Sequence, residues 1–165
     1  MNSPAFLAGG AAVPASPALD VSPSSAAVGP AVGAAALVHE FWRRMASNDF
    51  ASVGELLTED FVLDWPQSGE RFRGADRFVR MNQEYPANGP WRFRLHRVVG
   101  GAHDAVSDVG VTDGVQQARV ISFFDCDLAA GRVRRLVEFW PEPYAAPTNR
   151  AHLAEPIDDA EGEGG

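Results

Sequence analysis

A single glutamate stands out in the last predicted strand, within the stretch "RLVEFWPEPY". Side chains alternate between the two faces of a strand, so Glu138 shares one face with Leu136 and Trp140. A carboxylate buried among apolar groups costs several kcal/mol unless it finds a partner or takes up a proton. Glu138 therefore either lines a polar pocket, where it could act as an acid or a base, or forms an ion pair with an arginine on a neighbouring strand.

Other residue types that carry chemistry form no recognisable pattern. The four histidines (His39, His96, His103 and His152) have no ligand spacing with one another or with Cys126, the single cysteine. We therefore expect no metal site and no internal disulfide. The sequence also lacks a phosphate-binding glycine loop and a nucleophile motif, and no cofactor is expected.

Aromatic side chains are the second feature that could serve a site. The predicted helices and strands carry five bulky rings at apolar positions: Phe41, Trp42, Trp65, Phe123 and Trp140. Such rings usually form a core, but a cavity lined by aromatic groups and a few polar ones is also the usual make-up of a small-molecule site. On the second interpretation these residues form a pocket for a small hydrophobic molecule, flat or cyclic in shape.

Three helices precede most of the strands that would position these residues. The first is "AAALVHEFWRRMASND", whose apolar residues recur at helical spacing on one stripe. Asp49 can cap the second helix. A short hairpin, "FVLDWP" and "RFRG" joined by "QSGE", leads to the third helix, "ADRFVRMNQEYP", which Pro86 stops.

Four longer strands are predicted from Trp91 onward. The segment "WRFRLHRVV" alternates apolar and basic residues, and "AVSDVGVT" and "VQQARVISFFDCD" flank Asp113-Gly114, a strong signal for a two-residue hairpin. The turn "LAAG" leads into "RVRRLVEFWP". This order predicts an α+β domain in which three N-terminal helices pack on one face of a curved antiparallel sheet.

The predicted domain spans residues 34–153. Residues 1–33 are nearly all Ala, Pro, Ser, Gly and Val, and residues 154–165 are acidic, so both ends are expected to be disordered. The formal net charge is −8 and no basic patch appears, which argues against nucleic acid as a partner. No apolar run could span a membrane and no basic segment precedes the first apolar residues, so we expect a cytoplasmic protein.

The order of these elements, together with "NDFASVGELLTEDFVLDWPQSGERFRGADRFVRM", resembles the nuclear transport factor 2-like superfamily and, within it, the SnoaL-like polyketide cyclases. The resemblance covers about residues 34–140. It implies a cone-shaped fold with a cavity between the concave sheet face and the first helices. Because this fold hosts isomerases, hydrolases, dehydratases, cyclases and binding modules, the resemblance does not fix the function.

Ketosteroid isomerases resemble the chain over the same elements, but their catalytic groups have no counterpart here. The general-base aspartate of that family falls at Trp65, its tyrosine at Phe41 and its second acid at Phe123. Asp64 adjoins the base position, but an offset of one residue places it on the opposite face of the strand. Steroid isomerisation by that family's mechanism is therefore not expected.

Limonene-epoxide hydrolases offer a partial match. The pattern around "DVGVTDG" places their proton-donating acid at Asp108, and "VEFWPE" places their water-activating acid at Glu138. Their bridging arginine would fall at Val106. We expect Arg119, on the strand between the two acids and on the same face as Phe123, to supply that charge. It would keep one acid ionised as a base, while the other retains its proton and acts as a donor.

Two functions stay open at this point. One is an enzyme that acts on a small hydrophobic molecule by acid–base chemistry, through cyclisation, isomerisation, dehydration or epoxide opening. The other is a non-catalytic module that binds a small molecule or a protein.

The sequence also predicts a homodimer. Apolar groups in "WRFRLHRVV", with Val137 and Phe139, exceed what the helices can cover, so we expect two copies to associate through the outer sheet face. The resemblance implies a dimer as well.

Overall fold

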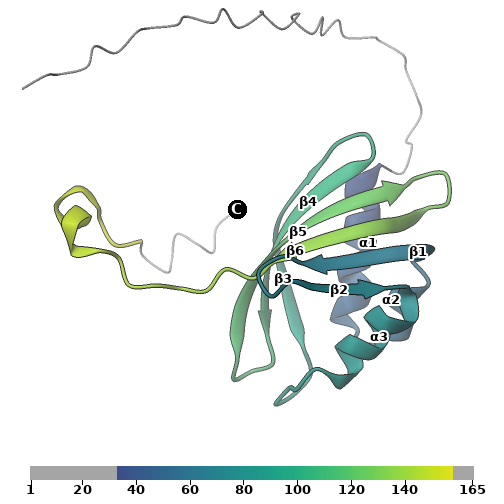
Figure 1. Ribbon diagram of the computed structural model, residues 1–165, viewed down its shortest axis with the longest axis horizontal. Coiled ribbons are helices and arrows are strands. Elements are labelled where there is room, and N and C mark those ends of the chain that lie inside the picture. Colours follow the sequence, from purple (N-terminus) through teal and green to yellow (C-terminus); the bar gives the residue numbers. More distant parts are fainter. Residues whose placement is uncertain (1–32, 158–165) are drawn as a thin grey trace, which may run out of the picture.

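Six strands form one open, curved sheet in the computed structural model, which describes residues 33–157 (Figure 1). The strands lie in the order β2-β1-β6-β5-β4-β3. Their bounds are β1 Leu57–Trp65, β2 Glu70–Arg73, β3 Arg92–Gly100, β4 Asp104–Thr112, β5 Gln117–Asp127 and β6 Arg132–Phe139. The α+β class and the helices at the N-terminal end are as the sequence predicts.

The sheet is mixed, so the prediction of a purely antiparallel sheet is wrong. Strands β3 to β6 pair as consecutive antiparallel neighbours, but β1 pairs with β6 in parallel, with Asp64 beside Val137. The short β1–β2 hairpin thereby becomes the far edge of the main sheet. Periodicity indicates which residues form strands and which face they present, but it does not indicate which distant strand becomes the neighbour.

Three helices lie on one side of this sheet: α1 Ala34–Ala46, the single-turn α2 Phe50–Gly54, and α3 Ala75–Glu84. Figure 1 shows α1 crossing behind the strands, with α2 and α3 gathered beside β2. The helix α1 packs on β3, β4 and β5, and α3 packs on β1 and β2. The predicted stripe of α1 is buried: Leu37, Val38, Phe41, Trp42 and Met45.

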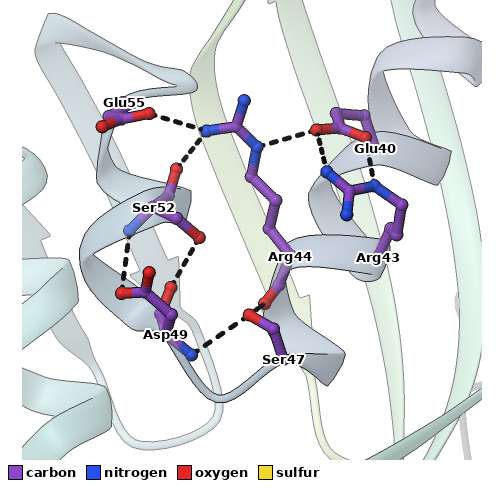
Figure 2. Close-up of polar contacts among 7 residues, drawn as sticks. All are labelled: Glu40, Arg43, Arg44, Ser47, Asp49, Ser52 and Glu55. Carbon is purple, nitrogen blue, oxygen red and sulfur yellow. Dashed lines mark hydrogen bonds and ion pairs between the residues drawn. The ribbon is translucent and has the colours of Figure 1, made fainter.

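Arg44 joins α1 to α2 (Figure 2). Its guanidinium donates to Glu40 on its own helix (2.8 Å), to the backbone carbonyl of Ser52 (2.5 Å) and to Glu55 (3.0 Å). The side chain of Asp49 caps α2 by accepting from the backbone N–H of Ser52, as predicted. Arg44 thereby ties α2 and Glu55, the residue after it, to α1.

The two faces of the sheet differ in composition, and strand alternation separates them. In β4, alternate residues from Ala105 to Val111 are buried toward the helices, and in β5 the corresponding inward residues are Val120, Ser122, Phe124 and Cys126. We call this the inner face. The opposite, outer face carries residues such as Phe123 and Phe139, both of which are exposed.

The loop between β4 and β5 differs from the predicted two-residue hairpin. Thr112 pairs with Gln117, so four residues connect the strands, with Gly114 at a positive φ of 96°. The carboxylate of Asp113 explains the longer loop, because it accepts from the backbone N–H groups of Val115 and Gln116. It also accepts from Gln116 Nε2 within the loop, and from the backbone N–H and Nδ2 of Asn88, which tie this loop to the segment before β3.

The chain leaves the sheet after β6. The 3₁₀ turn at Thr148–Leu153 has no buried residue, and Figure 1 shows this segment running away from the strands. Residues 1–32 of the predicted leader and 158–165 of the predicted acidic tail lie outside the described residues. Within residues 33–157, no helix has both the length and the apolar character needed to cross a membrane.

Candidate functional site

A cavity of about 480 Å³ opens between the inner face of the sheet and the helices α1 and α3. Aromatic and polar side chains together make up most of its wall. All four tryptophans of the sequence contribute, together with Phe78, Phe93 and Tyr85: Trp42 from α1, Trp65 from β1, Trp91 just before β3 and Trp140 just after β6. The volume and the lining are those of a site for a small, predominantly apolar molecule.

Glu138 lines this cavity from β6, the strand that lies between β1 and β5. The residue is only 6% exposed. The indole Nε1 of Trp65 donates to one carboxyl oxygen at 2.9 Å, and the hydroxyl of Ser122 donates to the other at 3.3 Å. Both partners come from the neighbouring strands, so the sheet itself positions the carboxyl group.

Burial raises the pKa of Glu138 to about 7, because water is excluded from the ionised form. The hydrogen bonds from Trp65 and Ser122 act in the opposite direction, since each stabilises the carboxylate. The balance leaves this carboxyl able to give and to take a proton near neutral pH, the property required of a general acid or base.

Two buried serines make room for this arrangement. Ser107 in β4 lies directly opposite Ser122 in β5. Ser107 accepts from the indole Nε1 of Trp42 at 2.9 Å, just as Glu138 accepts from Trp65. The hydroxyl groups of these serines satisfy the indole N–H of Trp42 and the carboxyl group of Glu138 on the inner face. A larger apolar residue at either position would leave these groups without that hydrogen bond.

Trp91 is held in the cavity wall by an asparagine 43 residues earlier in the chain. Asn48, at the end of α1 with a positive φ of 60°, accepts from the backbone N–H of Trp91 and donates to its carbonyl, both at 2.8 Å. The left-handed backbone conformation of Asn48, which asparagine tolerates better than most residues, places its amide toward β3.

Three of the five predicted pocket aromatics line the cavity, and two do not. Trp42, Trp65 and Trp140 are in the wall. Phe41 is 1% exposed and belongs to the core, where its ring meets Phe78 and Phe124 as well as Trp42. Phe123 is 46% exposed on the outer face. The assignment of Phe41 and Phe123 to the pocket was therefore wrong.

Arg119 and Asp108 do not join Glu138. They form a bidentate ion pair with each other on the outer face, with N–O distances of 2.6 and 2.5 Å. That hydrogen bonding holds the pKa of Asp108 below its usual value. Ser122, not Phe123, is the residue opposite Glu138, so the inner face of β5 is one residue out of step with the predicted one.

The physical reason for this error lies in the composition of β5. Both of its faces carry bulky apolar groups, and the inner set is interrupted by Ser122. The resemblance to the ketosteroid isomerases placed Phe123 at a pocket position and so favoured the face of Ile121 and Phe123, and the bulk of these residues gave no signal against it. The predicted ion pair between Glu138 and Arg119 is absent, and Arg119 cannot bridge Glu138 to Asp108, because the two acids lie on opposite faces of the sheet.

Asp64 lies away from the cavity, as expected from its offset relative to Trp65. It accepts from Arg71 and from Arg135 on the outer face. These arginines, Arg71 first, lower the pKa of Asp64 to about 2. A carboxylate held in this way is a structural ion-pair partner and not an acid–base group at neutral pH.

Sequence reasoning missed Ser122 and Trp91 as residues of the site. A serine between Ile121 and Phe123 does signal an exception in an apolar strand, as Glu138 does in β6, but a hydroxyl is a weaker signal than a charge. Trp91 could be found only through the Asn48 contact, which joins residues 43 positions apart.

Comparison with known proteins places the fold in a family. Residues 38–136 match the SnoaL-like domain family. A crystal structure from Kribbella flavida DSM 17836, described as a proposed ketosteroid isomerase, is 31% identical, with a TM-score of 0.68 over 75% of this chain and 89% of that one. No curated protein matches the sequence.

Two more distant structures share the fold. An NTF-2 like protein of unknown function from Burkholderia xenovorans LB400 is 21% identical, with a TM-score of 0.62 over 74% of this chain and 93% of that one. An LEH-like epoxide hydrolase of M. tuberculosis is 18% identical, with a TM-score of 0.54 over 65% of this chain and 81% of that one. By its sequence match and its architecture, the chain belongs to the SnoaL-like domain family, within the NTF2-like fold.

Proposed function

We propose that this protein is an enzyme that moves a proton on a small hydrophobic molecule held in the cavity, with Glu138 as the acid–base residue. The observation that carries the proposal is the position of Glu138: a buried carboxyl group in the wall of an aromatic cavity, with a pKa of about 7. The 31% identical Kribbella structure, described as a proposed ketosteroid isomerase, supports proton transfer as the reaction type.

The geometry favours chemistry that one carboxyl group can complete. Ionised Glu138 would take a proton from a carbon next to a carbonyl group, and the electron pair of that C–H bond would move toward the carbonyl oxygen. The protonated carboxyl would then return the proton to another carbon of the same molecule, which is an isomerisation. In an intramolecular ring closure, it would instead return the proton to the new alkoxide.

Trp65 and Ser122 would keep the carboxyl oriented through both steps, since their hydrogen bonds fix one oxygen each. The apolar wall would exclude water and so raise the basicity of the carboxylate. Epoxide opening by an acid pair loses its support, because Asp108 lies on the outer face. Within residues 33–157 no aspartate belongs to the cavity lining, so any isomerisation here would depend on Glu138, the buried carboxyl group of that lining.

A non-catalytic binding module is the second candidate, and one observation favours it. Both oxygens of Glu138 already accept a hydrogen bond from the protein, which is how a buried structural carboxyl group is satisfied. In that case the cavity binds a ligand and catalyses no reaction.

The location in the cytoplasm and the homodimer stay predictions from the sequence.

Exchange of carbon-bound hydrogen separates the two candidates without knowledge of the natural substrate. The protein would be incubated with 2-tetralone in D₂O, and the loss of the α-hydrogen signals followed by proton NMR. The wild type should accelerate exchange, and Glu138→Gln should remove roughly 100-fold or more of that acceleration. The variant Asp108→Asn, a matched change on the outer face, should accelerate exchange of the ketone hydrogens as much as the wild type does.

Circular dichroism would establish that both variants are folded. Exchange that is equally fast in Glu138→Gln would refute the assignment of Glu138. Binding of the ketone without any acceleration by the wild type would favour the binding module.

A further inference from the structure

The mouth of the cavity is acidic. Glu70, at the start of β2, and Glu142, beyond the end of β6, line the cavity, and both are exposed. Within residues 33–157, no arginine or histidine belongs to the lining. A carboxylate or phosphate ligand would therefore meet negative charge at the mouth and a neutral or negative carboxyl group inside.

Two tryptophans of the cavity lining neighbour these acids in the sheet or in the sequence. Trp65 is opposite Glu70 in the β1–β2 pairing, and Trp140 precedes Glu142 by two residues. The two indole rings are in edge-to-face contact, with centroids 6.3 Å apart. Gln67 fixes the backbone of Trp140 by accepting from its N–H at 2.5 Å and donating to its carbonyl at 3.2 Å.

We propose that the ligand of this cavity is a small hydrophobic amine, whose apolar body fills the aromatic interior and whose protonated nitrogen stays at the mouth. A cation over an indole face is attracted by the ring, and the nearby carboxylates of Glu70 and Glu142 add to that attraction. At the mouth the nitrogen keeps part of its water, so the large cost of burying an ammonium group is avoided. This inference rests on the proposed function, since it takes the cavity as the ligand site.

Three probes of one shape test the charge requirement: 1-adamantylmethylamine, 1-adamantylmethanol and 1-adamantanecarboxylate. They present the same apolar cage with a cationic, a neutral and an anionic group. None absorbs where tryptophan does, and all four tryptophans line the cavity, so binding can be followed by the intrinsic fluorescence of the protein. At neutral pH the amine should bind about fivefold more tightly than the alcohol, and the carboxylate should bind weakest.

The double variant Glu70→Gln/Glu142→Gln should bind the amine and the alcohol with nearly equal affinity, while its affinity for the alcohol stays as in the wild type. Glu59→Gln is the matched control, because it removes a charge at an exposed position of β1 outside the cavity lining. It should retain the preference for the amine. Circular dichroism would verify the folds.

Several outcomes would overturn the proposal. Tighter binding of the alcohol or of the carboxylate would do so, and so would an amine preference that survives in the double variant. In these cases the cavity would still bind a ligand, and the proposed function would stand. If none of the three probes changes the fluorescence, both the amine proposal and the cavity as ligand site are refuted.

Discussion

Burial of the Glu138 carboxyl group lowers the stability of the fold that positions it. Its carboxyl group is removed from water by β1 and β5 and receives two neutral hydrogen-bond donors in return. Neutral donors compensate the desolvation of a carboxylate only in part. The uncompensated desolvation cost is what raises the pKa of Glu138 to about 7. A residue retained at such a cost is a better candidate for chemistry than for structure.

The stability of the protein should therefore depend on pH through Glu138. Its pKa is about 7 in the folded state and 4.5 in the reference state, so between these values the folded protein holds a proton that the unfolded chain has released. The free energy of unfolding should fall as pH rises across this range, by about 3 kcal/mol at most.

Urea denaturation of the wild type and of Glu138→Gln, at several pH values, measures this effect. The wild type should lose stability relative to the variant from pH 4.5 to about 7, with no further change above. If the free energy of unfolding varies with pH in the same way in both proteins, Glu138 has the same pKa in the folded protein as in the unfolded chain.

Trp65 should tune the acid–base midpoint of any reaction. Its indole N–H stabilises the carboxylate of Glu138, so Trp65→Phe should raise the pKa of that carboxyl further and move the rise in exchange rate to higher pH. At neutral pH the rate should fall by up to about tenfold. The pH profile of ketone exchange is the measurement.

Trp42→Phe is the comparison for Trp65→Phe. It removes an indole N–H that donates to Ser107 and not to Glu138, so the midpoint should not move even if the protein is less stable. A midpoint that shifts equally in both variants would assign the effect to general loosening of the cavity.

At the scale of secondary-structure elements, much of the architecture follows from the sequence. The stripe of α1, the Asp49 cap and the hairpin strands from Arg92 onward are local properties of periodicity and capping, and all are observed. The inward position of Glu138 was predicted from the same kind of pattern, as a polar residue that interrupts an apolar alternation.

Contacts between distant residues were not predictable in this way. The parallel β1–β6 pairing and the face of β5 depend on which strands meet, and both faces of β5 are apolar enough to suit a core. The ion pair of Arg119 with Asp108 follows from that face. Residue types along one strand do not decide between two such arrangements, because the free-energy difference comes from packing against side chains of the neighbouring strands and helices.

The junction of α1 and α2 should depend on Arg44 and not on its neighbour Arg43. Arg44→Met removes bonds to a backbone carbonyl and two carboxylates and should lower the free energy of unfolding by about 1–2 kcal/mol. Arg43 is exposed and bonds only Glu40 within its own helix, so Arg43→Met should leave the stability nearly unchanged. Urea denaturation of both variants compares them, and equal losses would contradict this role for Arg44.

At the scale of the whole molecule, the outer face carries a patch of apolar side chains. Phe123 and Phe139 are in ring contact at 6.0 Å and both are exposed, beside the half-buried Ile121 and Val137. Ion pairs border this patch. Arg119 pairs with Asp108 on one side, and on the other side Arg134 pairs with Asp125 while Arg71 and Arg135 pair with Asp64. An apolar centre with a polar rim is the usual anatomy of a protein interface.

We predict that two copies associate through this face. Sedimentation equilibrium at micromolar concentration should give twice the mass of the chain, which is 17.7 kDa. The double variant Phe123→Asp/Phe139→Asp should sediment as a monomer. Leu153→Asp, a change at an exposed residue outside the sheet, should remain a dimer. A wild-type mass of one chain would refute the prediction.

The place of β6 in the sheet has a consequence for how the chain folds. This strand comes last in the sequence but lies between β1 and β5, and its contact from Trp65 to Glu138 spans 73 residues. Hairpins from β3 to β5 can form from local contacts, whereas closing β6 against β1 must overcome the entropy of a long loop. Until that step Glu138 stays hydrated as an ordinary acid, so a chain still being synthesised acquires its carboxyl site only when the final strand docks.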